Sequence, residues 1–117
     1  MAQKDEMEIR LILKEMGGRY WEKGLYKRVY FNKAELLNIM GVDIDYLKNK
    51  ANADISGVGP EKMLLNALES TKVYYDLVDE EWRTEYCSGV AGEYRLFVGM
   101  AVRKLEGQLK MRIPPRA

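Results

Sequence analysis

Apolar residues are spaced in two ways along this 117-residue chain, and the two spacings predict helices and strands in a definite order. A spacing of three and four residues puts apolar side chains on one face of a helix. It predicts helices over residues 5–16, 33–40, 60–69 and 92–109. Alternation of apolar and polar residues puts every second side chain on the same face of a strand. It predicts strands around residues 20–21, 25–31, 73–78 and 82–86.

Turn and cap residues separate these segments. Gly17 and Gly18 follow the first helical pattern, and glycine commonly ends a helix because it adopts a left-handed conformation easily. Residues 22–24 predict a tight turn between the first two strands, and residues 79–80 predict one between the last two. Asn32, with a glutamate three residues later, predicts a capping box at the start of the second helix.

The segment from residue 42 to residue 58 has the weakest pattern in the chain. Val42, Ile44 and Tyr46 alternate with polar residues, which predicts a short strand. Residues 49–52 are then expected to form a polar loop, before Pro60 begins the next helix.

The element order predicts an α+β fold, α-ββ-α-α-ββ-α. We expect the two β-hairpins to join in one antiparallel sheet packed against about four helices, with the other face of the sheet in solvent. No Pro- or Gly-rich linker divides the sequence, so residues 1–117 are expected to form a single domain, with residues 111–117 as a frayed tail.

Composition narrows the chemistry. The chain has no histidine, which removes the commonest general base and the commonest metal ligand, so a histidine-dependent triad is excluded. Cys87 has no second cysteine to pair with, and we expect it to be a small buried or edge-strand residue. The formal charge of +1 lacks the basic excess that duplex DNA binding normally requires.

No other signal indicates an enzyme, a cofactor or a membrane. The glycines at 57, 59, 89 and 92 match no phosphate-binding motif, and the acid pairs at 43/45 and 79–81 lack the further ligands of a metal site. No apolar run is long enough to span a bilayer, and the first ten residues do not have the form of a signal peptide. We therefore expect a non-enzymatic cytoplasmic protein with no cofactor and no metal.

The first hairpin is the sharpest candidate for a binding surface. Tyr26, Arg28 and Tyr30 alternate with Lys27 and Val29, so the first three are expected to share one face of the sheet. Trp, Tyr and Arg are the residue types that dominate protein-interface hot spots, and rings beside cations also bind single-stranded nucleic acid. The candidate partner-binding residues are Tyr20, Trp21, Lys23, Tyr26, Lys27, Arg28 and Tyr30. Ordinary sheet packing, protein contact and nucleic-acid contact all remain open as interpretations.

The same residues resemble a group of small uncharacterised proteins from phages and other mobile elements. The matching positions are Gly17, Gly18, Trp21, Glu22, Lys23, Lys27, Arg28, Val29, Tyr30 and Asn32, followed by Lys72, Val73, Tyr74, Tyr75 and Asp76. The resemblance spans residues 10–83, fits residues 51–62 loosely and excludes the last helix. It implies a mobile-element accessory protein, and it brings no known activity and no catalytic residue.

Two functional hypotheses from different classes follow. The first is a binding protein that occludes a surface on a host protein, for example a component of a bacterial antiviral system such as CRISPR. The second is a small nucleic-acid-binding domain that uses the aromatic and basic hairpin face. The broad apolar stripe of the last helix also leaves a homodimer open.

Overall fold

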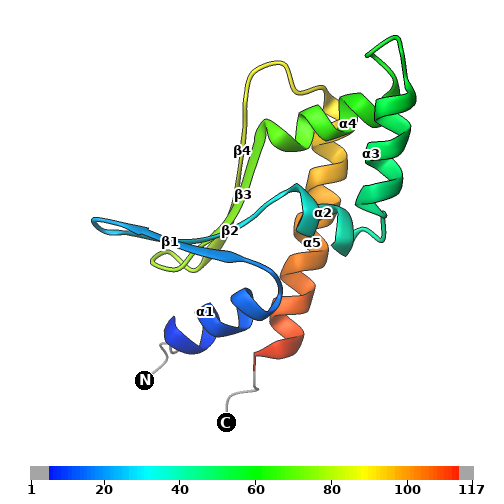
Figure 1. Ribbon diagram of the computed structural model, residues 1–117. Coiled ribbons are helices and arrows are strands. Elements are labelled where there is room, and N and C mark those ends of the chain that lie inside the picture. The colour runs from blue at the N-terminus through cyan, green and yellow to red at the C-terminus, as the bar shows by residue number, and fades with distance from the viewer. Residues whose placement is uncertain (1–5, 114–117) are drawn as a thin grey trace.

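In the computed structural model, which describes residues 6–113, an antiparallel sheet of four strands carries its helices on one side (Figure 1). The strands are β1 (Arg19–Lys23), β2 (Tyr26–Phe31), β3 (Thr71–Asp76) and β4 (Glu81–Tyr86). The helices are α1 (Glu6–Glu15), α2 (Lys33–Ile39), α3 (Ile44–Ala53), α4 (Pro60–Glu69) and α5 (Gly92–Arg112). The α+β class and the single sheet built from two hairpins are confirmed.

The strands lie in sequence order, β1-β2-β3-β4, and each neighbouring pair is antiparallel. The β2–β3 pairing runs from Arg28 opposite Asp76 to Phe31 opposite Val73, and the N–H of Leu77 also donates to the carbonyl of Lys27 at 2.9 Å. Within residues 6–113, no strand pairs with the turn end of the first hairpin on its β2 side. That end therefore extends beyond the helices as a two-stranded arm (Figure 1).

The core lies between the sheet and the helices. Val29, Phe31, Val73 and Tyr75 point from the central strands into one apolar cluster. The helices contribute the remaining buried residues, with α5 crossing the layer through Val98, Ala101, Leu105 and Leu109. Burying these apolar side chains is the main favourable term in the folding free energy.

The two consecutive glycines after α1, Gly17 and Gly18, have different structural roles. Gly17 has φ of 104°, a left-handed conformation that ends the helix at little cost because glycine has no Cβ. Gly18 instead lies against the core: a Cβ there would be 2.4 Å from Cγ1 of Val29 and 2.8 Å from Cζ of Phe31. The chain can cross from α1 into β1 at this point because residue 18 has no side chain.

The segment 42–58 contradicts the sequence-based expectation of a short strand and a polar loop. Residues Ile44–Ala53 form α3, and the Asp43 carboxylate begins this helix by accepting the N–H of Asp45 at 2.9 Å. Leu47 and Ala51 are buried four residues apart, which is a helical spacing. Tyr46 is exposed, so the alternation that predicted a strand does not reflect burial.

Two boundaries also differ from the prediction. The first hairpin turns at Gly24-Leu25 and not at residues 22–24: Lys23 is paired with Tyr26, Gly24 has φ of 59°, and Leu25 is exposed in the turn. Helix α5 continues to Arg112, so residues 111 and 112 are helical and not frayed. Of the rest of the expected tail, Ile113 is the residue that follows α5, and residues 114–117 lie outside the described residues, as does residue 5 of the first predicted helix.

The capping box at Asn32 is confirmed and yields a first prediction. The Asn32 side chain accepts the N–H groups of Ala34 and Glu35, and the Glu35 side chain accepts the N–H of Asn32. Replacing Asn32 with Ala leaves these helix-start donors without their partner, so Asn32→Ala should cost about 1 kcal/mol of unfolding free energy. Urea unfolding measures this, with Asn38→Ala at an exposed position of the same helix as the control.

Candidate functional site

The face of the sheet opposite the helices is the candidate binding surface. Successive side chains of a strand point to opposite faces of a sheet, so every second residue of each strand lies on this open face. The strand register shows which residues these are. From β1 to β4 they are Arg19, Trp21 and Lys23; Tyr26, Arg28 and Tyr30; Lys72, Tyr74 and Asp76; Glu81, Arg83 and Glu85. Tyr74 is buried but lies outside the core cluster, because its neighbours on the open face cover it.

Arg28 lies among four aromatic side chains on this face, which we call the Arg28 cluster (Trp21, Tyr26, Arg28, Tyr30 and Tyr74). Its guanidinium carbon lies 4.4 Å from the ring centroid of Tyr74, 4.9 Å from that of Tyr26 and 5.4 Å from that of Trp21. A cation at such distances from a ring face is attracted by the ring quadrupole. Nη1 of Arg28 also donates to the Tyr30 hydroxyl at 2.9 Å.

The rings of the Arg28 cluster also support one another. The Tyr30 ring packs against the Tyr74 ring with centroids 4.9 Å apart, and the Trp21 ring meets Tyr30 edge-on at 6.0 Å. These contacts tie β1, β2 and β3 together on the open face, so the arginine is held by side chains that are themselves packed. The cluster is therefore preorganised.

Arg28 and Arg83, two of the three arginines on the open face, differ in their partners. Arg83 lies among the carboxylates of Asp76, Asp79 and Glu81, so its charge is balanced within the β3–β4 hairpin. Arg28 forms no ion pair with any carboxylate in residues 6–113, and its Nε is buried without a hydrogen-bond partner. The hydrogen bond to Tyr30 raises the pKa of Arg28, so its full positive charge is retained.

The tyrosine beneath Arg28 is fixed by burial and by a carboxylate. The Tyr74 hydroxyl donates to Oε2 of Glu85 at 2.7 Å. Burial, with the hydrogen bond to Glu85 as the second cause, raises the pKa of Tyr74 to about 12. Burial likewise raises the pKa of Tyr75, on the helix-covered face, to about 12. Both phenols are neutral near pH 7.

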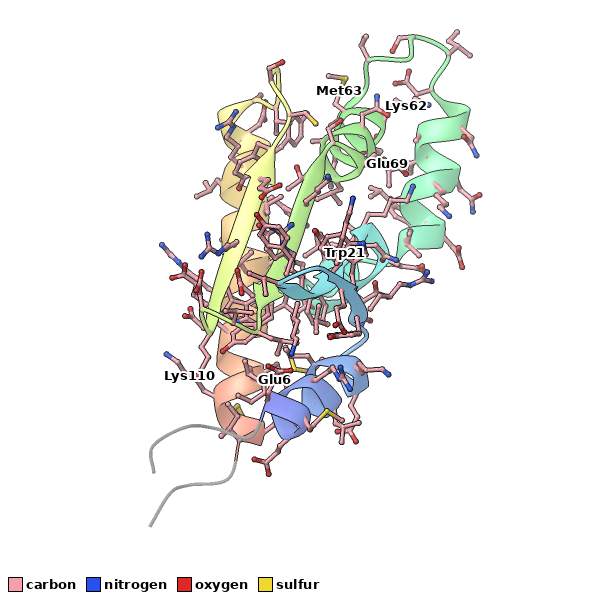
Figure 2. The ribbon with its side chains drawn as sticks, turned by 90° about the vertical axis from the view of Figure 1, so that its left-hand side faces the viewer. Glu6, Trp21, Lys62, Met63, Glu69 and Lys110 are labelled. Atoms are coloured by element: carbon pink, nitrogen blue, oxygen red, sulfur yellow. The ribbon has the colours of Figure 1, made fainter. Side chains whose placement is uncertain are left out.

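A groove opens beside Arg28 at the end of the arm. It has a volume of about 750 Å³ and is lined by Trp21, Lys23, Gly24, Leu25, Tyr26 and Arg28. Apolar surface on Trp21, Leu25 and Tyr26 is exposed here, with Leu25 89% exposed. Figure 2 views the molecule from the side toward which the arm projects: Trp21 faces the viewer, and Met63 of α4 lies far from it at the upper end.

Five of the seven predicted binding residues share the open face and two do not. Trp21, Lys23, Tyr26, Arg28 and Tyr30 lie on it together. Tyr20 is opposite Val29 on the helix-covered face, where the Arg10 guanidinium lies over its ring. Lys27 is on that face too and pairs with Glu6 of α1 at 3.6 Å. The alternation of β1 and β2 requires this separation, and it overrides the proximity of these residues in sequence.

The sequence-based prediction missed Tyr74, Arg83 and Glu85. All three belong to the second hairpin, and their place beside Arg28 depends on the β2–β3 register, which is set by contacts distant in sequence. Tyr74 alternates with Val73 and Tyr75 along β3, which was a local signal for the face of Tyr74 but not for the pairing of the strands.

Other features of the described residues add no further site. No group of three or more acidic, cysteine or histidine side chains in residues 6–113 is placed to hold a metal ion, and no helix there is both long and apolar enough to cross a membrane. Cys87, expected to be a buried or edge-strand residue, is exposed and directly follows the edge strand β4. Lys33, the first residue of α2, pairs with Glu69 of α4.

Comparison with known proteins does not extend this description. No protein-family model matches the chain, and neither the curated proteins nor the solved structures give a significant match.

Proposed function

We propose that this protein is a non-enzymatic binding module that docks the Arg28 cluster and the adjoining groove on a surface of another protein. The observation that supports the proposal most strongly is the arginine held by four aromatic side chains at the base of the arm, on the sheet face opposite the helices. Trp, Tyr and Arg supply most of the binding energy at protein interfaces.

Preorganisation favours this use of the face. Ordering a flexible side chain at an interface costs about 0.5–1.5 kcal/mol, and the ring contacts around Arg28 have already met that cost in the free protein. The partly exposed Trp21 and Tyr26 offer apolar area beside the charge. This combination gives both affinity and orientation to a docked protein surface.

The resemblance of the hairpin sequence to mobile-element proteins gives the proposal its biological setting. In that setting the partner is a host protein in the bacterial cytoplasm, and binding blocks the surface that the partner uses. A component of an antiviral system such as CRISPR is one such target.

The proposal predicts that a partner is lost when the exposed rings are removed. Tagged protein should recover a host protein from lysate, and the recovered partner, once purified, should bind saturably. The double variant Trp21→Ala/Tyr26→Ala should weaken that binding at least tenfold, because each truncation of a hot-spot residue costs more than about 1 kcal/mol.

The control for that experiment lies on the opposite side of the molecule. Leu96→Ala/Met100→Ala removes two exposed apolar side chains of α5 and should leave the affinity unchanged. A partner that binds the Trp21→Ala/Tyr26→Ala variant as tightly as the unaltered protein would contradict docking through this face.

Nucleic-acid binding is the second candidate, because exposed Trp21 and Tyr26 rings beside Arg28 and Lys23 match a stacking platform for single strands. The carboxylates of Asp76, Glu81 and Glu85 share the open face and repel a phosphate backbone, which makes this candidate weaker. Fluorescence polarisation with a labelled oligothymidine at low salt tests it. A dissociation constant above about 10⁻⁴ M, the weak end of non-specific binding, would dismiss it.

A further inference from the structure

We infer that the Arg28 cluster is a receptor for an acidic side chain of the partner, with an apolar neighbour of that side chain seated in the adjoining groove. This inference rests on the proposed protein-binding function and adds the chemistry of the partner: an aspartate or glutamate flanked by apolar residues.

The geometry leaves the Arg28 guanidinium without an ion pair to any carboxylate in residues 6–113, although rings hold it in place. Every carboxylate near Arg83 is engaged with that arginine, and Glu85 accepts the hydroxyl of Tyr74. Arg28 is surrounded by rings, which attract the cation but offer its N–H groups one hydroxyl acceptor, that of Tyr30. A planar guanidinium binds a carboxylate through two parallel hydrogen bonds, so an incoming acid supplies what the cluster lacks.

Charge is divided across the open face in a way that sets the position of such an acid. The β1–β2 part carries Arg19, Lys23 and Arg28 and no carboxylate. The β3–β4 part carries Asp76, Glu81 and Glu85 beside Lys72 and Arg83. A carboxylate is therefore attracted to the arm and repelled from the second hairpin, and Lys23 at the groove adds to the attraction.

The groove explains why the acid should have an apolar neighbour. Arg28 lines the same hollow as Trp21, Leu25 and Tyr26, so a chain that places a carboxylate on Arg28 also places its adjacent residues against these three. Covering the rings removes water from the guanidinium and strengthens the charged hydrogen bond.

The test compares two capped peptides, Ac-Leu-Glu-Leu-NH2 and Ac-Leu-Gln-Leu-NH2, which differ in one charge. Each is titrated into the unaltered protein at low salt while the two tryptophan indole N–H signals are followed by NMR. Trp21 lines the groove, whereas Trp82 packs against Phe31 and Tyr75 on the helix-covered face and serves as an internal control. The glutamate peptide should bind about tenfold tighter and shift Trp21 but not Trp82.

Substitutions of Arg28 distinguish the effect of its positive charge from the effect of its planar guanidinium. Arg28→Gln should abolish the preference for the glutamate peptide. Arg28→Lys should keep part of it, because lysine keeps the positive charge but lacks the planar guanidinium that forms two parallel hydrogen bonds. Arg103→Gln, at an exposed position of α5, is the matched control and should change nothing. Equal binding of the two peptides by the unaltered protein would overturn the inference without any variant.

Three further outcomes would also overturn it. Trp21 shifts that depend on protein concentration alone would show that a second copy of this chain occupies the groove. A stronger response to oligothymidine than to the glutamate peptide would assign the cluster to phosphate. A captured protein partner that depends on Trp21 and Tyr26 but binds Arg28→Gln equally well would leave the proposed function standing and remove the acidic-partner inference.

Discussion

Gly18→Ala should lower the free energy of unfolding by about 3 kcal/mol and the melting temperature by roughly 10 to 15 °C. The added methyl would lie 2.4 Å from Cγ1 of Val29 and 2.8 Å from Cζ of Phe31, both of which are buried in the core. Val29 is branched at Cβ and is packed on all sides, so the strain is relieved only by moving backbone or opening the core.

Thermal and urea unfolding measure this effect, and a second glycine provides a control of opposite sign. A Cβ on Gly99 of α5 would meet nothing within 4 Å, so Gly99→Ala should stabilise the protein by up to about 1 kcal/mol through helix propensity. Val29→Ala should cost less in the Gly18→Ala background than alone, because it removes the methyl that clashes. Equal costs in the two backgrounds would place the strain elsewhere.

Raising the pH above about 10 should destabilise the protein through Tyr74 and Tyr75. Burial raises the pKa of each to about 12 in the folded state, whereas an unfolded tyrosine ionises near 10. Below pH 10 both phenols are protonated, and their contribution to the free energy of unfolding is fully present. Between pH 10 and pH 12 the unfolded chain loses these protons first, and each tyrosine costs on the order of 2 kcal/mol by pH 12.

Urea unfolding at pH 8, 10 and 11 measures this loss, with pH 8 as the reference at which both phenols are neutral in the folded and the unfolded state. Tyr74→Phe should remove its share of the pH dependence, since phenylalanine does not ionise. Tyr46→Phe, on the exposed side of α3, should leave the pH dependence unchanged. An identical slope in Tyr74→Phe and the unaltered protein would contradict this origin.

Local signals in the sequence predicted the parts of the fold that depend on neighbouring residues. The Asn32–Glu35 capping box, the break at Gly17 and the two hairpins each follow from residues within a few positions of one another. Helix α3 was missed because Val42, Ile44 and Tyr46 also alternate, and in so short a segment the burial of Leu47 decides between the two periods.

The candidate site was predicted in part for the same physical reason. Alternation placed Tyr26, Arg28 and Tyr30 together, and Trp21 joined them from the next strand. Tyr20 and Lys27, also among the candidate binding residues, lie on the helix-covered face because successive side chains of a strand point to opposite faces. Tyr74 under Arg28 depends on the pairing of β2 with β3, about forty residues apart along the chain, and no local pattern specifies that register.

The limited extent of the β2–β3 pairing has a consequence for motion. Arg28 is the last residue of β2 paired in register with β3, and the backbone of residues 22–26 pairs only within the hairpin ladder. A two-stranded ribbon is marginally stable by itself, so the amides of the arm should exchange with solvent through local opening while the core stays protected. The tip of the arm can therefore adjust its backbone to an opposing surface, while Arg28 stays fixed at the point where the rigid sheet begins.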